Sequence, residues 1–106
     1  MVLVEETYRL TANLPKNEGF GLKSQMRRAA VSIPSNIAEG KTRNHDREFL
    51  HFLHIALGSL SAWETQLEIT VRLRIRSSEE AQIMSEIWQE LGKMLHGLAN
   101  LLRVKK

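Results

Sequence analysis

The sequence predicts an all-α protein, an elongated up-down-up-down antiparallel four-helix bundle that assembles as a homo-oligomer. At about 100° of rotation per residue, apolar residues fall on two lines, spaced by threes and fours as in packed helices. The lines consist of Phe49, Leu53, Ala56, Leu60, Trp63 and Leu67, and of Met84, Trp88, Leu91, Leu95, Leu98 and Leu102. A further apolar stripe beside the second line makes its apolar arc too broad for a helix with one neighbour. The chain is therefore expected to bury apolar surface against other copies.

Four helices are expected, at residues 2–13, 20–40, 45–74 and 78–104, in a single domain over residues 1–106. The first helix stops before Pro15, because the residue before a proline disfavours helical backbone. Its inner face consists of Leu3, Thr7, Leu10 and Leu14. In the second helix, Pro34 predicts a kink rather than a break, and Gly40 is the expected terminator. The inner face there consists of Leu22, Met26, Ala29, Ala30, Ile33 and Ile37.

The third helix is expected to start with Asn44 or Asp46 as its cap and to be long. It would measure on the order of 43 Å at about 1.5 Å per residue, against roughly 26 Å for the diameter of a compact domain of this size. The bundle must therefore be elongated. Ser77 and Glu80 have the spacing of a capping box at the start of the fourth helix. Short connections between long helices favour antiparallel neighbours.

Apolar residues away from the inner lines are the predicted subunit interface. They are Ile55, Ile69 and Leu73 on the third helix, and Ile83, Ile87, Met94 and Leu101 on the fourth. Small residues at the middle of the third helix, including Gly58, Ser61 and Ala62, would permit close approach of another helix. The alternative is that these are scattered surface aliphatics, which are normal when they occur singly.

The composition is that of an ordinary globular domain, with 42% hydrophobic and 25% charged residues among 106. The chain contains no cysteine, which excludes disulfides, thiolate zinc sites and cysteine nucleophiles. Its start does not resemble a signal peptide, and it lacks an uncharged apolar run of about 18 residues. We expect a cytoplasmic protein with no membrane partner.

Candidate catalytic and metal-binding patterns are incomplete. Glu48-x-x-His51 has the spacing of a carboxylate-bridged metal site, but such sites need a second Glu-x-x-His motif and further inward glutamates. By helical phase, His51 and His54 point outward. Ser32, Ser35 and Ser59 lack a nucleophile turn and are expected to be packing residues. Gly19-Phe20-Gly21 lacks the remaining glycine and the lysine of a phosphate loop. The sequence therefore predicts no enzyme, no metal and no cofactor.

The charge favours an anionic partner. The formal net charge is +3 at pH 7, and the isoelectric point is about 9.6. Five chains together would carry roughly +15, and phosphate contacts dominate nucleic-acid affinity. The candidate nucleic-acid-binding residues are Arg27, Lys41, Arg43, Arg47, Arg72, Arg74 and Arg76. The alternative is a solvated polar face with internal ion pairs, since no aromatic residue is interleaved among these basic residues to stack a base.

Several motifs carry a family resemblance that covers nearly the whole chain. The main one is the run GLKSQMRRAAVSIPSNIAEG at residues 21–40, accompanied by Tyr8-x-Leu10-Thr11, the Glu48-Phe49-x-x-Phe52-Leu53 segment with its Ala56-x-Gly58-Ser59 continuation, and residues 64–67. These segments resemble the four-helix-bundle proteins encoded in intervening sequences of 23S ribosomal RNA genes. The resemblance implies a four-helix bundle that assembles as a homopentamer. It also implies an earlier start of the first helix, so this first helix is expected to leave part of the long helices uncovered.

The family in turn resembles the accessory variability protein of diversity-generating retroelements. That likeness implies a pentameric barrel with a basic surface that binds nucleic acid and a reverse transcriptase. The leading hypothesis is therefore a non-enzymatic, pentameric bundle that binds RNA or DNA with low sequence specificity. The alternative is a protein-interaction scaffold or accessory subunit without a direct nucleic-acid role.

His45 stands where the family commonly has a capping serine, which leaves Asn44 as the expected substitute.

Overall fold

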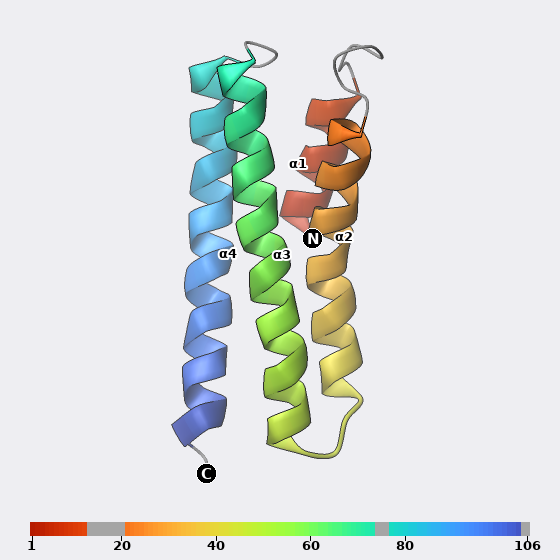
Figure 1. Cartoon of the computed structure of the whole chain (residues 1–106). Helices are drawn as coiled ribbons and strands as arrows, with labels where there is room; N and C mark the ends of the chain where they lie inside the picture. Colours follow the sequence, from red (N-terminus) through yellow and green to blue (C-terminus); the bar gives the residue numbers. More distant parts are fainter. Residues whose placement is uncertain (13–20, 74–76, 105–106) are drawn as a thin grey trace.

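The computed structural model describes residues 1–12, 21–73 and 77–104 of the chain and contains four α-helices (Figure 1). They are α1 (Val2–Thr11), α2 (Leu22–Lys41), α3 (Asp46–Arg72) and α4 (Ser78–Val104). The molecule measures 47 × 21 × 18 Å, with a radius of gyration of 14.9 Å. A compact 100-residue domain has a radius of gyration of about 13 Å, so the predicted elongation is confirmed.

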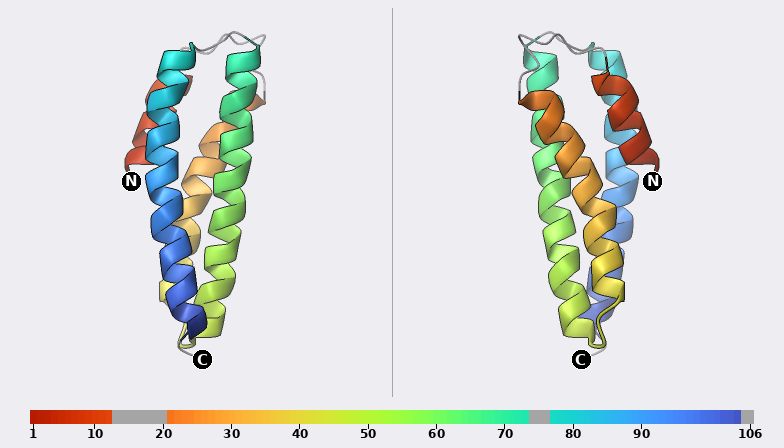
Figure 2. Two further views of the ribbon diagram at one scale, coloured as in Figure 1. Left: turned by 90° about the vertical axis from the view of Figure 1, so that its left-hand side faces the viewer. Right: turned by 90° about the vertical axis from the view of Figure 1, so that its right-hand side faces the viewer.

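Helices that are consecutive in the chain lie side by side and run antiparallel, and α1 closes the arrangement by contacting α4 (Figure 2). The predicted helices are confirmed to within two residues at each end, apart from the ends that fall on residues 13, 20 and 74, which lie outside the described residues. At 10 residues, α1 is far shorter than the 27-residue helices α3 and α4. It lies along only the upper part of α2 and α4 in Figure 1, which leaves the lower parts of these helices uncovered by it.

The predicted inner lines form the hydrophobic core. On α3 every member of its line is buried except Phe49, which is half-buried against the core. On α4 the line includes both buried and half-buried residues: Met84, Leu95 and Leu102 are buried, and Trp88, Leu91 and Leu98 are half-buried against the core. Ala30, Ile33 and Met26 are completely buried on α2, and Leu3 and Leu10 are buried on α1. Leu14, expected on the same face as Leu3, lies outside the described residues.

Both tryptophans connect helices through their indole N–H groups. Trp63 is completely buried, and its Nε1 donates to the Thr7 hydroxyl at 2.9 Å, joining α3 to α1. The Thr7 hydroxyl in turn donates to the Leu3 carbonyl at 2.6 Å, so neither polar group is left unsatisfied in the core. Trp88 Nε1 donates to the Leu60 carbonyl at 2.7 Å, joining α4 to α3. The sequence predicted both residues as core members and did not predict these bonds.

Arg27 attaches α1 to α2. Its Nε donates to the buried Thr11 hydroxyl at 2.8 Å, and its Nη2 donates to the Tyr8 carbonyl at 3.3 Å. The guanidinium also lies over the Tyr8 ring, 4.4 Å from the centroid, in a cation–π arrangement. These contacts hold the C-terminal turn of the short helix α1, which has few other residues with which to bind the bundle.

The start of α2 and its packing against α3 depend on two glycines. Gly21 precedes α2 with a φ of 81°, a backbone conformation that favours glycine. The expected termination at Gly40 is wrong, since α2 continues to Lys41. A Cβ atom on Gly40 would lie 2.7 Å from Phe49 Cδ1 and 3.1 Å from Phe52 Cβ. Gly40 therefore permits close approach of α3, and the helix passes unbroken through Pro34.

The caps of the long helices differ. The expectation that Asn44 or Asp46 caps α3 is wrong, because the N-cap is His45 and its side chain makes no capping bond. Asp46 and Glu48 lie in the first turn of α3, where their negative charges interact favourably with the positive end of the helix dipole. At α4 one half of the predicted capping box is present, since Glu80 N donates to the Ser77 hydroxyl at 3.2 Å. The same hydroxyl donates to the Glu80 carboxylate at 3.1 Å.

Candidate nucleic-acid interface

The described members of the predicted basic set divide between the two ends of the bundle. Lys41, Arg43 and Arg47 lie at the end formed by the α2–α3 connection, which is the lower end in Figure 1. The C-terminal turn of α4 brings Arg103 to the same end. We call this end of the molecule the basic end and define it by Lys41, Arg43, Arg47, His51, His54 and Arg103. All six residues are exposed.

An aromatic ring lies between two members of the basic end. The Arg43 guanidinium lies 5.0 Å from the centroid of the Phe52 ring, and the His51 ring packs edge-on against the same ring at 5.4 Å. The Phe52 ring thus lies between two basic side chains, but it is half-buried and contacted by the Arg43 guanidinium rather than open for a base to stack on. Arg43 also donates to the Glu39 carboxylate at 2.8 Å. The half-buried phenyl ring holds both basic side chains at the surface of α3.

A second row of basic groups crosses from α3 to α4. Arg47, His51 and His54 are spaced by four and three residues and so share one face of α3. Arg103 Nη2 lies 3.3 Å from His54 Nε2, and Arg103 Nη1 donates to Asn100 Oδ1 at 2.6 Å. This contact joins the C-terminal turn of α4 to the outward face of α3.

Carboxylates neutralise part of this charge. Glu39 is paired with Arg43, while Asp46 and Glu48 lie in the first turn of α3. Within the described residues, Lys41 and Arg47 form no ion pair. Two exposed cations are thus available to an anionic ligand at the end of the bundle where Arg43 and His51 contact Phe52.

Toward the opposite end of the bundle, the two described members of the predicted set, Arg27 and Arg72, are engaged within the chain. Arg27 is bound to Thr11 and Tyr8, and Arg72 donates to the Glu68 carboxylate at 3.0 Å. Arg74 and Arg76 lie outside the described residues. The structure does not bring Arg27 and Arg72 close to Lys41, Arg43 and Arg47, because the length of α3 separates the two ends.

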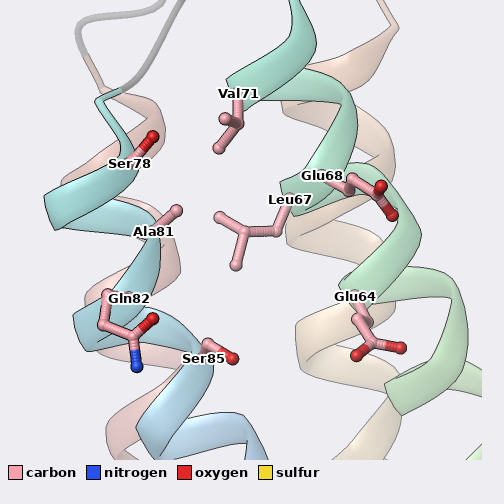
Figure 3. Close-up of a pocket in the computed structure, with 8 residues that line it drawn as sticks. All are labelled: Glu64, Leu67, Glu68, Val71, Ser78, Ala81, Gln82 and Ser85. Carbon is pink, nitrogen blue, oxygen red and sulfur yellow. The ribbon is translucent and has the colours of Figure 1, made fainter.

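A groove between α3 and α4 lies near Arg72 (Figure 3). Its volume is about 280 Å³, and Leu67, Val71 and Ala81 face one another across it. The remaining lining residues are Glu64, Glu68, Ser78, Gln82 and Ser85. Two carboxylates and no cation among these residues disfavour a phosphate here.

The other polar residues singled out by the sequence have structural contacts. The Ser59 hydroxyl donates to the Ser32 hydroxyl at 2.8 Å, and Asn36 Nδ2 donates to the Ser32 carbonyl at 2.8 Å, which joins α3 to α2 beside Pro34. Ser32 and Ser59 are thus packing residues, as expected. His51 and His54 point outward, also as expected. In the part of the chain that the structure describes, no three histidine, aspartate or glutamate residues are grouped so as to hold a metal ion.

The predicted interface residues are exposed in the single chain, with one exception. Met94 is 70% exposed, and Leu73 and Ile83 are each 58% exposed. Ile55, Ile69 and Leu101 are also exposed, whereas Ile87 is half-buried against the core. Beside Ile87 and Met94 lies a groove of about 220 Å³ between α4 and the start of α1, lined by Met1, Val2 and Leu3 on the α1 side.

The fold defines the protein as an elongated four-helix bundle with two exposed apolar faces and a basic end. The chain belongs to the 23S rRNA-intervening sequence protein family, whose model matches residues 1–97. The structure is similar to the crystal structure of a protein of unknown function from the S23 ribosomal protein family of Bacteroides thetaiotaomicron. That protein is 24% identical, the match covers 92% of this chain and 89% of the other, and the TM-score is 0.79.

This likeness shows the same fold and says nothing of activity. No curated protein matches the sequence. None of the described helices is long and apolar enough to cross a membrane.

Proposed function

We propose that the protein is a non-enzymatic homo-oligomer, pentameric as the family resemblance implies, that binds RNA or DNA with low sequence specificity through the basic end. One observation carries the proposal: Lys41, Arg43 and Arg47 are exposed at one end of the bundle, where Arg43 and His51 contact the Phe52 ring. Guanidinium and ammonium groups contact phosphates, and such contacts position a nucleic acid without reading its sequence. The exposed His51 ring adds a surface on which an unpaired base can stack.

Self-association would supply the affinity that one chain lacks. A single basic end carries few free cations, but the net charge of +3 per chain is multiplied in an oligomer. Several phosphate contacts made at once raise affinity steeply, because each contact releases condensed counterions. Arg72 and Arg27, although predicted with the others, are assigned no phosphate contact in this proposal, since both lie toward the opposite end of the bundle from the basic end.

The test is a titration of labelled structured RNA and duplex DNA with the wild-type protein, first at low and then at rising ionic strength. We expect binding of both, with the logarithm of the affinity falling by about 0.9 per phosphate contact on duplex DNA for each unit of log salt. Replacing Lys41, Arg43 and Arg47 together by alanine should weaken binding by at least about tenfold and reduce this slope.

The matched control replaces Lys23, Arg28 and Lys93 by alanine, which removes the same charge away from the basic end. This control should retain most of the affinity. Equal losses in the two triple variants would mean that net charge alone drives binding. Absence of binding by the wild-type oligomer at low ionic strength would contradict the proposal and favour the protein-interaction scaffold.

A further inference from the structure

The exposed apolar residues of α3 and α4 form two rows on different faces of the bundle. We call Ile55, Ala62, Ile69 and Leu73 the α3 seam, and Ile83, Ile87, Met94 and Leu101 the α4 seam. Seven of these eight side chains are exposed, and the eighth, Ile87, is half-buried. Each seam spans 18 residue steps from first to last, which is on the order of 27 Å of helix. Apolar rows of this length on two helices are more than the single exposed aliphatics that any surface carries.

The two seams have the same spacing when one is followed in reverse. From Leu73 toward the N-terminus, the α3 seam steps by four, seven and seven residues. From Ile83 toward the C-terminus, the α4 seam also steps by four, seven and seven residues. Every α-helix rises by the same distance per residue. When the two helices run antiparallel, each residue of one seam can therefore lie level with one residue of the other, and we call each such pair a layer. The pairs are Leu73 with Ile83, Ile69 with Ile87, Ala62 with Met94, and Ile55 with Leu101.

The sizes of the paired side chains also fit. Ala62, the smallest seam residue, is set opposite Met94, which has the most exposed large side chain of the eight. Gly58, one turn away from Ala62, has open space beside it. The groove beside Ile87 and Met94 gives the α4 seam a recess that an aliphatic side chain could fill at the level of the Ile69–Ile87 pair.

Antiparallel pairing of either seam with itself fits poorly. If two α4 seams ran antiparallel with Ile83 of one opposite Leu101 of the other, Met94 would face Glu90 and Ile87 would face Gly97. If two α3 seams ran antiparallel with Ile55 of one opposite Leu73 of the other, Ile69 would face Ser59 and Ala62 would face Gln66. Only the α3–α4 combination keeps all four antiparallel layers apolar.

We propose that the α3 seam of one copy of this chain packs antiparallel against the α4 seam of a second copy. The inference rests on the proposed self-association and names the surfaces that produce it. Because α3 and α4 are themselves antiparallel within a chain, neighbouring copies then point in the same direction. Each copy in such a pair retains one unused seam, so the contact repeats and closes a ring when the rotation allows it. In such a ring every basic end lies on one face.

The experiment uses two variants that each damage one seam. The first is Ile55→Glu with Ile69→Glu, and the second is Met94→Glu with Leu101→Glu. Alone, each variant has only one intact seam and should remain a single subunit by light scattering on a sizing column. Mixed in equal amounts, they should form a one-to-one dimer, since the intact α4 seam of the first meets the intact α3 seam of the second. Val31→Glu, which alters an exposed aliphatic residue on α2, should assemble as the wild type does.

A cysteine pair tests the register and does not depend on how well the glutamate variants fold. The chain has no cysteine of its own. A mixture of Ala62→Cys and Met94→Cys chains should form a disulfide between chains under mild oxidation. A mixture of Ala62→Cys and Leu101→Cys, which is two turns out of register, should not.

The outcomes separate this inference from the proposed function. A wild-type chain that stays a single subunit overturns both the pairing and the self-association. An oligomeric wild type whose seam variants still self-associate, or whose mixed variants form no dimer, overturns the pairing only. Cross-linking of the Ala62→Cys chain with the out-of-register partner as readily as with the in-register one overturns the register.

Discussion

Helices α3 and α4 each carry two apolar rows, and the two rows differ in what covers them. The inner rows are covered by the other helices of the same chain, so that Leu53, Ala56 and Trp63 are completely buried. The outer rows, which are the two seams, are left largely in solvent. Both kinds of row consist of apolar residues, with isoleucine confined to the outer rows, so hydrophobicity alone does not say which row forms the fold. The inner rows therefore determine the stability of a single chain, whereas the outer rows can contribute only to contacts between chains.

The largest expected effect is at Trp63, at the centre of the inner row of α3. Trp63→Ala removes a completely buried side chain and the donor to the Thr7 hydroxyl. It should lower the free energy of unfolding by about 3 to 5 kcal/mol. Denaturant unfolding is measured in the background of Met94→Glu with Leu101→Glu, so that association does not contribute. A loss below about 1 kcal/mol, well under the usual cost of such a truncation, would show that the inner row is not the core.

The comparison is sharpest at two adjacent residues of α4. Leu95 is 4% exposed and Met94 is 70% exposed. Leu95→Ala should lower the free energy of unfolding of the single chain by about 2 to 5 kcal/mol, because it leaves a cavity in the core. Met94→Ala should change it by less than about 0.5 kcal/mol, both being measured in the single-subunit background of Ile55→Glu with Ile69→Glu. The same Met94→Ala change in the wild-type chain should weaken assembly, as seen by concentration-dependent sedimentation. Equal destabilisation by the two substitutions would abolish the distinction between the rows.

A smaller effect is expected at Arg27, which joins α1 to α2. Arg27→Ala removes the donor to the buried Thr11 hydroxyl and the contact with the Tyr8 ring. It should lower the free energy of unfolding by about 1 to 2 kcal/mol. Its exposed neighbour provides the control, since Arg28→Ala should cost less than about 0.5 kcal/mol. If both substitutions have the same small effect, Arg27 does not contribute to holding α1 on the bundle.

Much of the fold could be predicted because helical periodicity fixes which residues face inward. The inner lines of α2, α3 and α4 could be predicted from the sequence alone, and so could the bond between Ser77 and Glu80, because their spacing is a local pattern. The function of Gly40 could not be predicted, since it depends on how closely Phe49 of the next helix approaches. The cap of α3 was misassigned because the choice between Asn44 and His45 is decided by where the preceding turn ends.

The candidate site was predicted only in part, for a similar reason. Arg27 belonged to the predicted set, but its partner Thr11 lies on another helix, so no local pattern indicated the bond. The same holds for Arg43 and Phe52, which the α2–α3 connection brings together. One available signal was the length of α3, which already places Arg47 and Arg72 at opposite ends of the molecule. Arg103, next to His54, was missing from the predicted set because its position depends on the packing of α4 on α3.

The central claim is that the outer rows are buried between copies of the chain. The most direct test is the mass of the wild-type protein in solution, measured by light scattering on a sizing column from low to high micromolar concentration. The account predicts a discrete assembly of more than two subunits, which becomes a single subunit when either seam is changed to glutamate. A folded wild-type chain that remains a single subunit throughout this range would contradict it.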